Sequence, residues 1–475
     1  MADRPLWTIQ EVLAATGGTL HGSVTKPLNG VSIDSRSITD GDIFVAIKGD
    51  SHDGHAFAAK ALEAGAGLAV VSELTTEMLV QGPVLQVAED PLRGLEAMGR
   101  AARQWNKGKS IAITGSVGKT STKEMLRVAF AASGSTHAST ASFNNHWGVP
   151  LSLSRFPRDA AFGIFEIGMN HAGEITPLVG MVQPDVAIIT TIAASHLGHF
   201  HALDDIAEAK SEIFSGVAKG GAAVINRDSA YFDFLKSRAE INDIAAIIGF
   251  GKHDRAEVRL KQLVLHPTCS CVTADVMGED VAFKLGVPGA HMAMNSLAVL
   301  AAVKLAGADL ARAILALAEA KPAKGRGGQE LLIITGGDLL LLDESYNANP
   351  ESMAAAFDLL ATAAKPHKGR RIAVLGDMLE LGNFSADFHA GLVAPLDEAG
   401  VDRVYAAGPM MQHLWDRLPS SKRGLWAATS QELIAALNAD LRAGDSLVVK
   451  GSFGSKMGLI VEALRKQFTA MTKEN

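Results

Sequence analysis

The segment at residues 111–132 limits the possible folds of this chain more than any other part of the sequence. Three apolar residues at 111–113 predict a buried strand, and residues 120–132 predict a helix with apolar side chains on one side. A turn that contains Gly115 and Gly118 joins the strand to the helix. In this order of elements, the backbone N–H groups of the turn and of the helix N-terminus point to one spot and bind anions. The segment therefore predicts a phosphate-binding loop within an α/β sheet.

The turn itself has the residues that a nucleoside triphosphate site requires. Gly115 and Gly118 permit unusual dihedral angles and a close approach of the main chain to phosphates. Lys119 adds a mobile positive charge, and Thr120 offers a hydroxyl to Mg²⁺. The loop is shortened, because Ile113 stands where the general pattern has a glycine. A chance Gly-Lys-Thr in a tight turn is the alternative, but the flanking strand and helix favour a nucleotide site.

Composition and charge exclude several classes of protein. The chain has 475 residues, 48% of them hydrophobic and 20% charged, which is typical of an α/β protein with two to four domains. A net charge of −7 argues against a nucleic-acid partner. The cysteines Cys269 and Cys271 share one strand-like run and fit a reducing cytoplasm. The start has no signal-peptide core and polar residues interrupt the most apolar helix, at 292–306, so we expect a cytoplasmic chain without a membrane span.

Changes of pattern along the chain predict an α/β fold of three domains. Residues 1–88 predict a small mixed α/β domain. Strands and helices alternate over 89–320, which is typical of a parallel sheet with helices on both faces, although period-two alternation at 258–285 predicts antiparallel strands there. The glycine- and lysine-containing run 321–328 predicts a hinge. The last unit, 321–475, predicts a Rossmann-like sheet without a dinucleotide glycine motif, so we expect no nicotinamide or flavin.

Polar residues follow two predicted strands of the central domain, at the edge where such sheets bind their ligands. Glu166 lies near the end of the strand at 162–167, where a carboxylate is costly unless it is paired or metal-bound. His196 follows the strand at 186–190, and Lys210 lies on the next helix. Glu166 and His196 are therefore candidate ligands of a phosphate-bound Mg²⁺, which prefers oxygen but tolerates one imidazole. For His196 and Lys210, a place on the surface is the alternative.

Two classes of function remain on these grounds. One is a ligase or kinase that transfers a phosphoryl group to a substrate oxygen, with a second substrate delivered by closure at the hinge. The other is a switch or motor ATPase, which usually has an acid at the end of an apolar strand, a position that Asp343 occupies. Asp343 lies beyond the hinge and in a different predicted sheet from Lys119, which favours the enzyme.

At the level of motifs, the chain resembles the Mur ligase family. The matching residues occur in the family's order and run through all three predicted domains. They are Thr114-Gly115-Ser116-Val117-Gly118-Lys119-Thr120, Glu166, His196, Lys210, Asn295, Gly325-Arg326 and Asp343. Within the family, the runs at 343–350 and 376–382 and the segments 143–145 and 148–151 are similar to the member that adds D-alanyl-D-alanine. The Asp-Asn-Pro-Arg run that marks addition of diaminopimelate is absent.

The resemblance implies an ATP- and Mg²⁺-dependent amide ligase of the cytoplasmic stage of peptidoglycan synthesis. ATP would phosphorylate the terminal carboxylate of UDP-N-acetylmuramoyl-tripeptide, and the amine of D-alanyl-D-alanine would attack the acyl phosphate. The expected partners are therefore these small molecules, with no nucleic acid and no membrane, and the expected state is a monomer. The alternatives are another Mur-type ligase that adds a single amino acid and a folylpolyglutamate synthase-like ligase.

The resemblance also implies roles for individual residues. The catalytic residues would be Lys119, His196 and Lys210. The Mg²⁺ ligands would be Thr120, Glu166, His196 and Lys210, the last as a carbamate. ATP would contact Gly115, Ser116, Val117, Gly118, Lys119, Thr120, Ser121, Asn295, Arg326 and Asp343. Substrates would contact Ser35, Arg36 and His55 near the UDP group, Asn144 and Asn145 at the peptide, and Tyr346, Asn347, Asn349 and Lys450 near the dipeptide. From the residues alone, Arg36 and His55 are equally compatible with solvated turns.

Overall fold

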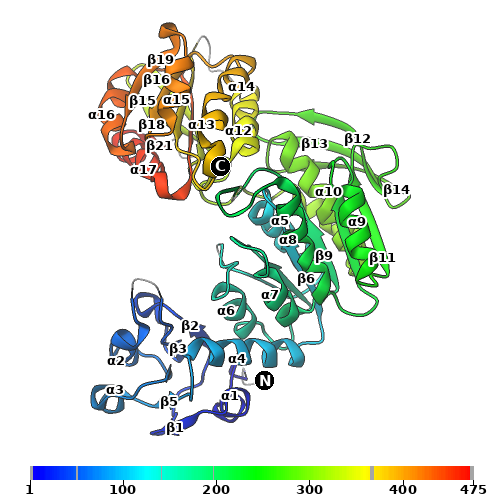
Figure 1. Cartoon of the computed structure of the whole chain (residues 1–475), viewed down its shortest axis with the longest axis vertical. Coiled ribbons are helices and arrows are strands. Elements are labelled where there is room, and N and C mark those ends of the chain that lie inside the picture. Colours follow the sequence, from blue (N-terminus) through cyan, green and yellow to red (C-terminus); the bar gives the residue numbers. More distant parts are fainter. Residues whose placement is uncertain (1–3, 50–51, 141, 196, 364–368, 471–475) are drawn as a thin grey trace.

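The computed structural model describes all residues except 1–3, 50–51, 141, 196, 364–368 and 471–475. The described chain forms three β-sheets that follow one another along the sequence, each with its own helices (Figure 1). This is the α/β architecture of three domains that the alternating pattern predicts. No helix in the described part of the chain combines the length and apolarity that crossing a bilayer requires.

The first sheet has the strand order β1-β5-β4-β3-β2, in which only β1 is antiparallel to its neighbour. Its strands are β1 (Thr19–His21), β2 (Gly30–Ser32), β3 (Asp42–Val45), β4 (Leu68–Val71) and β5 (Val84–Gln86). Its helices are α1 (Ile9–Thr16), α2 (Ala58–Glu63) and α3 (Thr76–Gln81). Helix α1 begins with a capping box between Thr8 and Glu11 and ends at Gly17, whose φ of 65° suits glycine.

The central sheet has the order β14-β13-β12-β11-β10-β9-β6-β8-β7. Its strands are β6 (Lys109–Thr114), β7 (Thr136–Ala138), β8 (Phe162–Glu166), β9 (Val186–Ile189), β10 (Ala222–Asn226), β11 (Ala246–Gly251), β12 (Val258–Leu265), β13 (Ser270–Val276) and β14 (Glu279–Leu285). The pairs from β7 to β12 are parallel, whereas β12, β13 and β14 pair antiparallel, as the period-two pattern predicts.

Helices cover both faces of the central sheet, and each face has its own apolar core. One core includes residues of α5 (Lys119–Ala131), α10 (Ala290–Leu305) and α11 (Leu310–Leu317). The other includes residues of α6 (Gly148–Ser154), α7 (Ile175–Val182), α8 (Leu203–Ser211) and α9 (Phe232–Ile241). Helix α4 (Pro91–Trp105) instead contributes Leu95 and Met98 to the core of the first sheet and also packs against α6. It therefore connects the first two sheets.

The third sheet has the order β19-β18-β17-β20-β16-β15-β21. Its strands are β15 (Gly328–Ile334), β16 (Gly337–Glu344), β17 (Arg371–Gly376), β18 (Arg403–Ala407), β19 (Arg423–Ala427), β20 (Ser446–Lys450) and β21 (Thr469–Ala470). Its helices are α12 (Pro350–Thr362), α13 (Ser385–Ala390), α14 (Val393–Glu398), α15 (Met411–Arg417), α16 (Ser430–Asp440) and α17 (Gly458–Gln467). The strands from β16 to β19 are mutually parallel, and β15 and β21 add an antiparallel edge.

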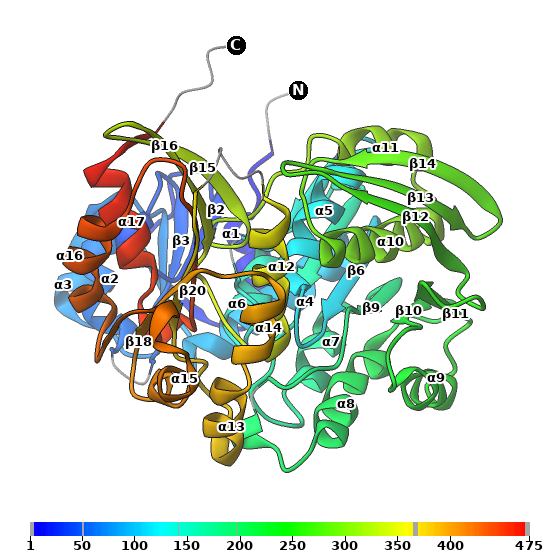
Figure 2. The ribbon, with the colours of Figure 1, turned by 90° about the horizontal axis from the view of Figure 1, so that it is seen from above.

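Two connections bring the third sheet to the central one. The segment between α11 and β15 is the predicted hinge, and Gly327 N donates to the backbone oxygen of Asp343 at 2.9 Å. Farther along the chain, Gly198 N of the central unit donates to the backbone oxygen of Glu380 at 2.8 Å. Figure 2 shows helix α13 of the third unit beside the central unit near α8. The ends of the two parallel sheets therefore lie around a shared region.

Candidate active site

The turn between β6 and α5 has the geometry of a phosphate-binding loop. Gly115 and Gly118 have φ values of 146° and 89°, which side chains rarely adopt. A Cβ atom on Gly115 would lie 1.9 Å from Oγ1 of Thr190, so only glycine fits there. The Lys119 ammonium donates a hydrogen bond of 2.6 Å to the backbone oxygen of Gly115. The strand–turn–helix predicted from the sequence is confirmed.

Residues that follow β9 hold this loop in place. Oγ1 of Thr190 donates to the backbone oxygen of Val117 at 2.6 Å. Ser116 N donates to the backbone oxygen of Thr191 at 2.8 Å, and Oγ of Ser116 donates to that of Ala193 at 2.9 Å. The residues directly after β9 therefore fix the conformation of the phosphate loop. Sequence reasoning missed Thr190, although its place at the end of an apolar strand was a usable signal.

Thr120 and Glu166 form an oxygen-rich pair directly after the loop. Oγ1 of Thr120 lies 3.0 and 3.1 Å from the two carboxylate oxygens of Glu166, a residue at the end of β8 that is 1% exposed. Nδ2 of Asn144 donates to the same carboxylate at 2.7 Å, so this amide supports Glu166. Buried hydroxyl and carboxylate oxygens fit Mg²⁺, which prefers hard oxygen ligands. His196 lies outside the described residues, and the described part contains no cluster of three or more His, Cys, Asp or Glu side chains suited to a metal.

Lys210 lies in the interior, which excludes the surface position considered from the sequence. Its side chain is 1% exposed on α8. Burial and the charge of Lys119 lower the pKa of Lys210 well below its ordinary value. Burial also lowers the pKa of Lys119, although the Glu166 carboxylate opposes this shift. An amine with a lowered pKa near the phosphate loop suits carbamate formation, which stays a prediction.

Asn295 and Arg326 lie around the same loop, from two different units. A Cβ atom on Gly118 would lie 2.8 Å from Nδ2 of Asn295, so this amide of α10 lies directly against the turn. The hinge residue Arg326 places its guanidinium carbon 4.4 Å from the ring centroid of Tyr346. Its charge lowers the pKa of Lys119. Arg326 therefore acts electrostatically on the phosphate loop while its guanidinium stacks on the ring of Tyr346.

Asp343 anchors the hinge. Its carboxylate is 4% exposed and accepts a hydrogen bond of 2.6 Å from Oγ of Ser345. Nη2 of Arg465, on α17, lies 3.4 Å from the other carboxylate oxygen. The backbone oxygen of Asp343 also accepts from Gly327 N, so Asp343 holds the residue that directly follows Arg326. The two roles that the resemblance implies for Asp343, contact with a ribose and orientation of the hinge, both stay predictions.

The residues expected near the dipeptide divide into two groups. Lys450 is 2% exposed, and Nζ donates to the backbone oxygen of Asn347 at 3.0 Å and to Glu344 at 3.3 Å. Burial lowers the pKa of Lys450, and Glu344 opposes the shift. Tyr346 presents its ring to Phe453 at a centroid distance of 5.8 Å. In contrast, Oδ1 of Asn349 accepts from Ser352 N at 2.9 Å and caps α12.

Side chains expected near the UDP-peptide are mostly engaged within their own units. Oδ1 of Asn145 accepts from Gly148 N at 2.9 Å at the start of α6. The guanidinium of Arg36 is exposed and pairs with Asp34 at 2.8 Å, beside Ser35 in a 3₁₀ turn. The ring nitrogens of His55 lie 2.7 Å from Asp53 Oδ1 and 3.0 Å from Ser72 N. The contacts of His55 therefore favour a structural role over a free ligand-binding imidazole.

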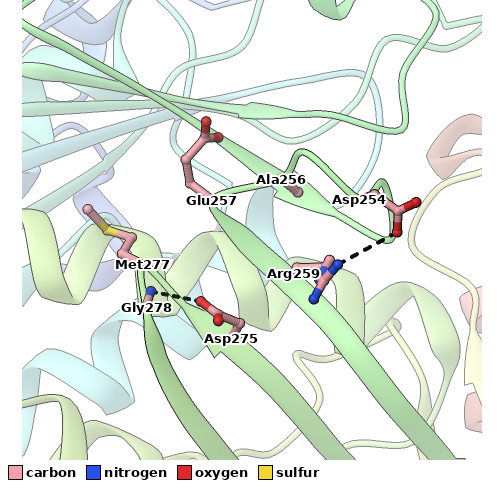
Figure 3. A pocket seen from close by; sticks show the side chains of 7 residues that line it. All are labelled: Asp254, Ala256, Glu257, Arg259, Asp275, Met277 and Gly278. Atoms are coloured by element: carbon pink, nitrogen blue, oxygen red, sulfur yellow. Dashed lines mark hydrogen bonds and ion pairs between the residues drawn. The ribbon is translucent and has the colours of Figure 1, made fainter.

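A surface cavity elsewhere contains none of these residues. Its volume is about 390 Å³, and it lies beside β12 and β13 (Figure 3). Its polar lining includes Asp254, Glu257 and Asp275, and Arg259 Nη1 lies 3.6 Å from Asp254. Asp275 accepts from Gly278 N at 2.8 Å, which closes the hairpin turn. These contacts stabilise the hairpin turn, and the cavity brings no predicted site residue together.

The comparisons with known proteins cover almost the whole chain. Three family models match: "Mur ligase family, catalytic domain" at 27–103, "Mur ligase middle domain" at 113–303, and "Mur ligase, glutamate ligase domain" at 332–453. The UDP-N-acetylmuramoyl-tripeptide–D-alanyl-D-alanine ligase of Rickettsia prowazekii is 32% identical, over 96% of this chain and 99% of that protein.

Solved structures agree with these matches. A crystal structure of MurF from Acinetobacter baumannii superimposes with a TM-score of 0.83 at 29% identity, over 97% of this chain and 99% of that one. MurF ligase from Thermotoga maritima, solved in complex with ADP, gives a TM-score of 0.74 at 25% identity, over 92% and 97% of the two chains. Sequence and structure both match over the full length, and the chain belongs to the Mur ligase family.

Proposed function

We propose that this chain is an ATP-dependent ligase that joins D-alanyl-D-alanine to UDP-N-acetylmuramoyl-tripeptide through an acyl phosphate. The observation that carries the proposal is the convergence of charges around the phosphate loop. Lys119 and the Thr120–Glu166 pair lie on the central unit, and Arg326 connects them electrostatically to Lys450 on the third unit. A relative that is 32% identical to this chain is named for this activity, which supports the choice of substrates.

The proposed reaction begins with transfer of the γ-phosphoryl group of ATP to a carboxylate, which is otherwise a poor electrophile. The Lys119 ammonium would exchange its bond to the Gly115 carbonyl for phosphate oxygens and stabilise their developing charge. Thr120 and Glu166 would hold Mg²⁺, which supplies further positive charge at the phosphates. Lys210, as a carbamate, would add an anionic oxygen to the same region. His196 retains its predicted role there.

The second step is attack of the dipeptide amine on the acyl phosphate. Tyr346, Asn347 and Lys450 border the place where we expect the dipeptide, at the carboxyl ends of β16 and β20. Lys450 is rigidly held by Glu344 and by the backbone, so it can bind an anionic group without first being ordered. Arg326 would remain near the transferred phosphate during this step.

We propose that each of the three units binds a different substrate. Residues 1–88 would bind the UDP group, 89–320 would bind ATP and Mg²⁺, and 321–475 would bind the dipeptide. Closure at the hinge would unite the three substrates and exclude water from the acyl phosphate. We further propose that the enzyme acts in the cytoplasm as a monomer.

One assay tests the proposal. Purified protein is given ATP, Mg²⁺ and UDP-tripeptide, and phosphate release is followed with D-alanyl-D-alanine, diaminopimelate or glutamate as the amine. We expect release to require both UDP-tripeptide and D-alanyl-D-alanine. Equal turnover with a single amino acid would refute the assignment and favour another Mur-type ligase. In a further reaction a folate replaces the UDP-tripeptide, and phosphate release with glutamate there would favour a folylpolyglutamate synthase-like ligase.

A further inference from the structure

The central and third units also contact each other through residues outside the phosphate loop. It is made by the segment 377–382 and helix α13, which follow β17. The backbone oxygen of Glu380 accepts from Gly198 N at 2.8 Å. A Cβ atom on Gly382 would lie 3.1 Å from Cα of Gly198, so the two backbones pack closely. Phe388, on α13, packs against the cores of both units, and Figure 2 shows α13 beside the central unit.

His389 lies directly behind this contact. Its side chain is fully buried, with 0% exposure. Nε2 accepts a hydrogen bond of 2.9 Å from Met378 N, and Nδ1 donates one of 2.7 Å to the backbone oxygen of Ser385. A backbone N–H can only donate and a carbonyl can only accept, so these partners require the neutral imidazole with its proton on Nδ1.

The segment that His389 holds also reaches the region expected to bind the dipeptide. Leu379 N donates to Oγ of Ser452 at 2.9 Å, and Ser452 N donates to the backbone oxygen of Asp377 at 3.0 Å. Ser452 follows Lys450, the buried lysine at the end of β20. A single imidazole therefore fixes one end of a segment that contacts the central unit and the loop after Lys450.

We propose that His389 is a positioning residue, whose neutral imidazole holds the segment 377–382 in the conformation that docks onto Gly198. The inference rests on the proposed ligase function only for its kinetic consequence, because the docking itself can be observed without substrates. Loss of this hydrogen bond would weaken docking and slow the step that needs both units. Binding of ATP to the phosphate loop alone would change little, since that loop lies wholly within the central unit.

The same geometry makes docking dependent on pH. Protonated His389 would direct an N–H group at the N–H of Met378, and this repulsion opposes the docked conformation. The charged and titratable groups that act on His389 are Asp377, at the end of β17, and His413, on α15. Burial lowers the pKa of His389, while the Ser385 carbonyl and Asp377 oppose the shift. A lowered pKa in the docked state means that docking is complete above the ordinary imidazole pKa of about 6.5 and is lost as the pH falls below it.

The test compares three variants with the wild-type protein. His389→Phe removes the acceptor for Met378 N, so we expect kcat to fall roughly tenfold, the effect of one unpaired buried donor, with the KM for ATP unchanged. His389→Gln offers an amide oxygen that accepts at every pH, so we expect it to restore kcat and to shift the acid limb of the pH profile downward. His413→Gln removes a charge that contributes to the lowered pKa of His389, so the acid limb should move slightly upward while kcat above it stays unchanged.

Hydrogen exchange gives the second readout. In the wild type, protection of the Gly198 and Met378 amides from exchange should fall as the pH decreases. This fall should be larger than in His389→Gln, which measures the effect of pH on exchange itself. Equal protection in the two proteins at low pH, or a wild-type kcat in His389→Phe, would overturn the proposal. If His389→Phe does not fold, the Gln variant decides alone. If the wild type ligates none of the tested amines, the proposed function fails, and the exchange data still decide the role of His389.

Discussion

Replacement of Lys119 by methionine separates a role in catalysis from a role in folding. The ammonium makes one described hydrogen bond, to the backbone oxygen of Gly115 at 2.6 Å, so its loss should lower the free energy of unfolding by only about 1 kcal/mol. In the transition state the same group would stabilise the charge on the transferred phosphoryl group. Loss of one such donor raises the barrier by about 3–4 kcal/mol, which corresponds to a hundred- to thousand-fold lower kcat. The expected effect on activity therefore greatly exceeds the effect on stability.

Urea unfolding and phosphate release measure the two effects separately. Lys123→Met is a matched control, because Lys123 lies one turn later on α5 and is fully buried, with its ammonium bonded to the backbone oxygen of Ser139 at 2.8 Å. We expect this variant to lose about 1–3 kcal/mol of stability and to keep the kcat of its folded fraction within about threefold. A Lys119→Met protein with more than half the wild-type rate would refute the phosphate-loop reasoning.

Three other predictions follow from the same contacts. Lys210→Ala should lose most activity and regain part of it when small carboxylates are added. A ¹³C-bicarbonate NMR signal seen in the wild type should be absent from the variant. Full activity of the variant without additives would mean that Lys210 contributes only to packing. Gly115→Ala should abolish ATP binding measured by calorimetry, because its Cβ would lie 1.9 Å from Oγ1 of Thr190, and normal affinity would contradict the tight packing of this turn. Burial lowers the pKa of His137 to about 4. The contribution of the neutral His137 side chain to the free energy of unfolding is therefore complete above about pH 6.5 and is lost toward pH 4. Urea unfolding of the wild type should therefore lose about 3 kcal/mol over this interval, and an equal loss in His137→Phe would exclude His137 as the cause.

Local patterns predicted the elements of the site well. The strand, the glycine turn and the helix at the phosphate loop are each specified by neighbouring residues, so the sequence reveals them directly. Asn349 is a counter-example, because the resemblance implies a substrate contact whereas Asn349-Pro350 and Ser352 are a helix N-cap signal, and the structure shows the cap.

Local sequence patterns do not reveal contacts between residues that are far apart in the sequence. The pairing of Asp343 with Arg465 joins residues 122 positions apart, and nothing near either residue identifies the other. The burial of Lys210 depends on how α8 packs, while its own helix has acidic and polar neighbours that resemble a surface. His389 escaped notice for the same reason, since its partner Met378 belongs to a different element.

The hydrogen bonds that hold the phosphate loop to the segment after β9 have a thermodynamic consequence. That segment runs on to Gly198, which contacts the third unit. If a nucleotide bound at the loop favours this contact by some factor, the contact must tighten nucleotide binding by the same factor, because coupling free energies are reciprocal. Any substrate that draws the third unit inward would then raise the affinity for ATP, and a variant that weakens the Gly198 contact would lose this synergy.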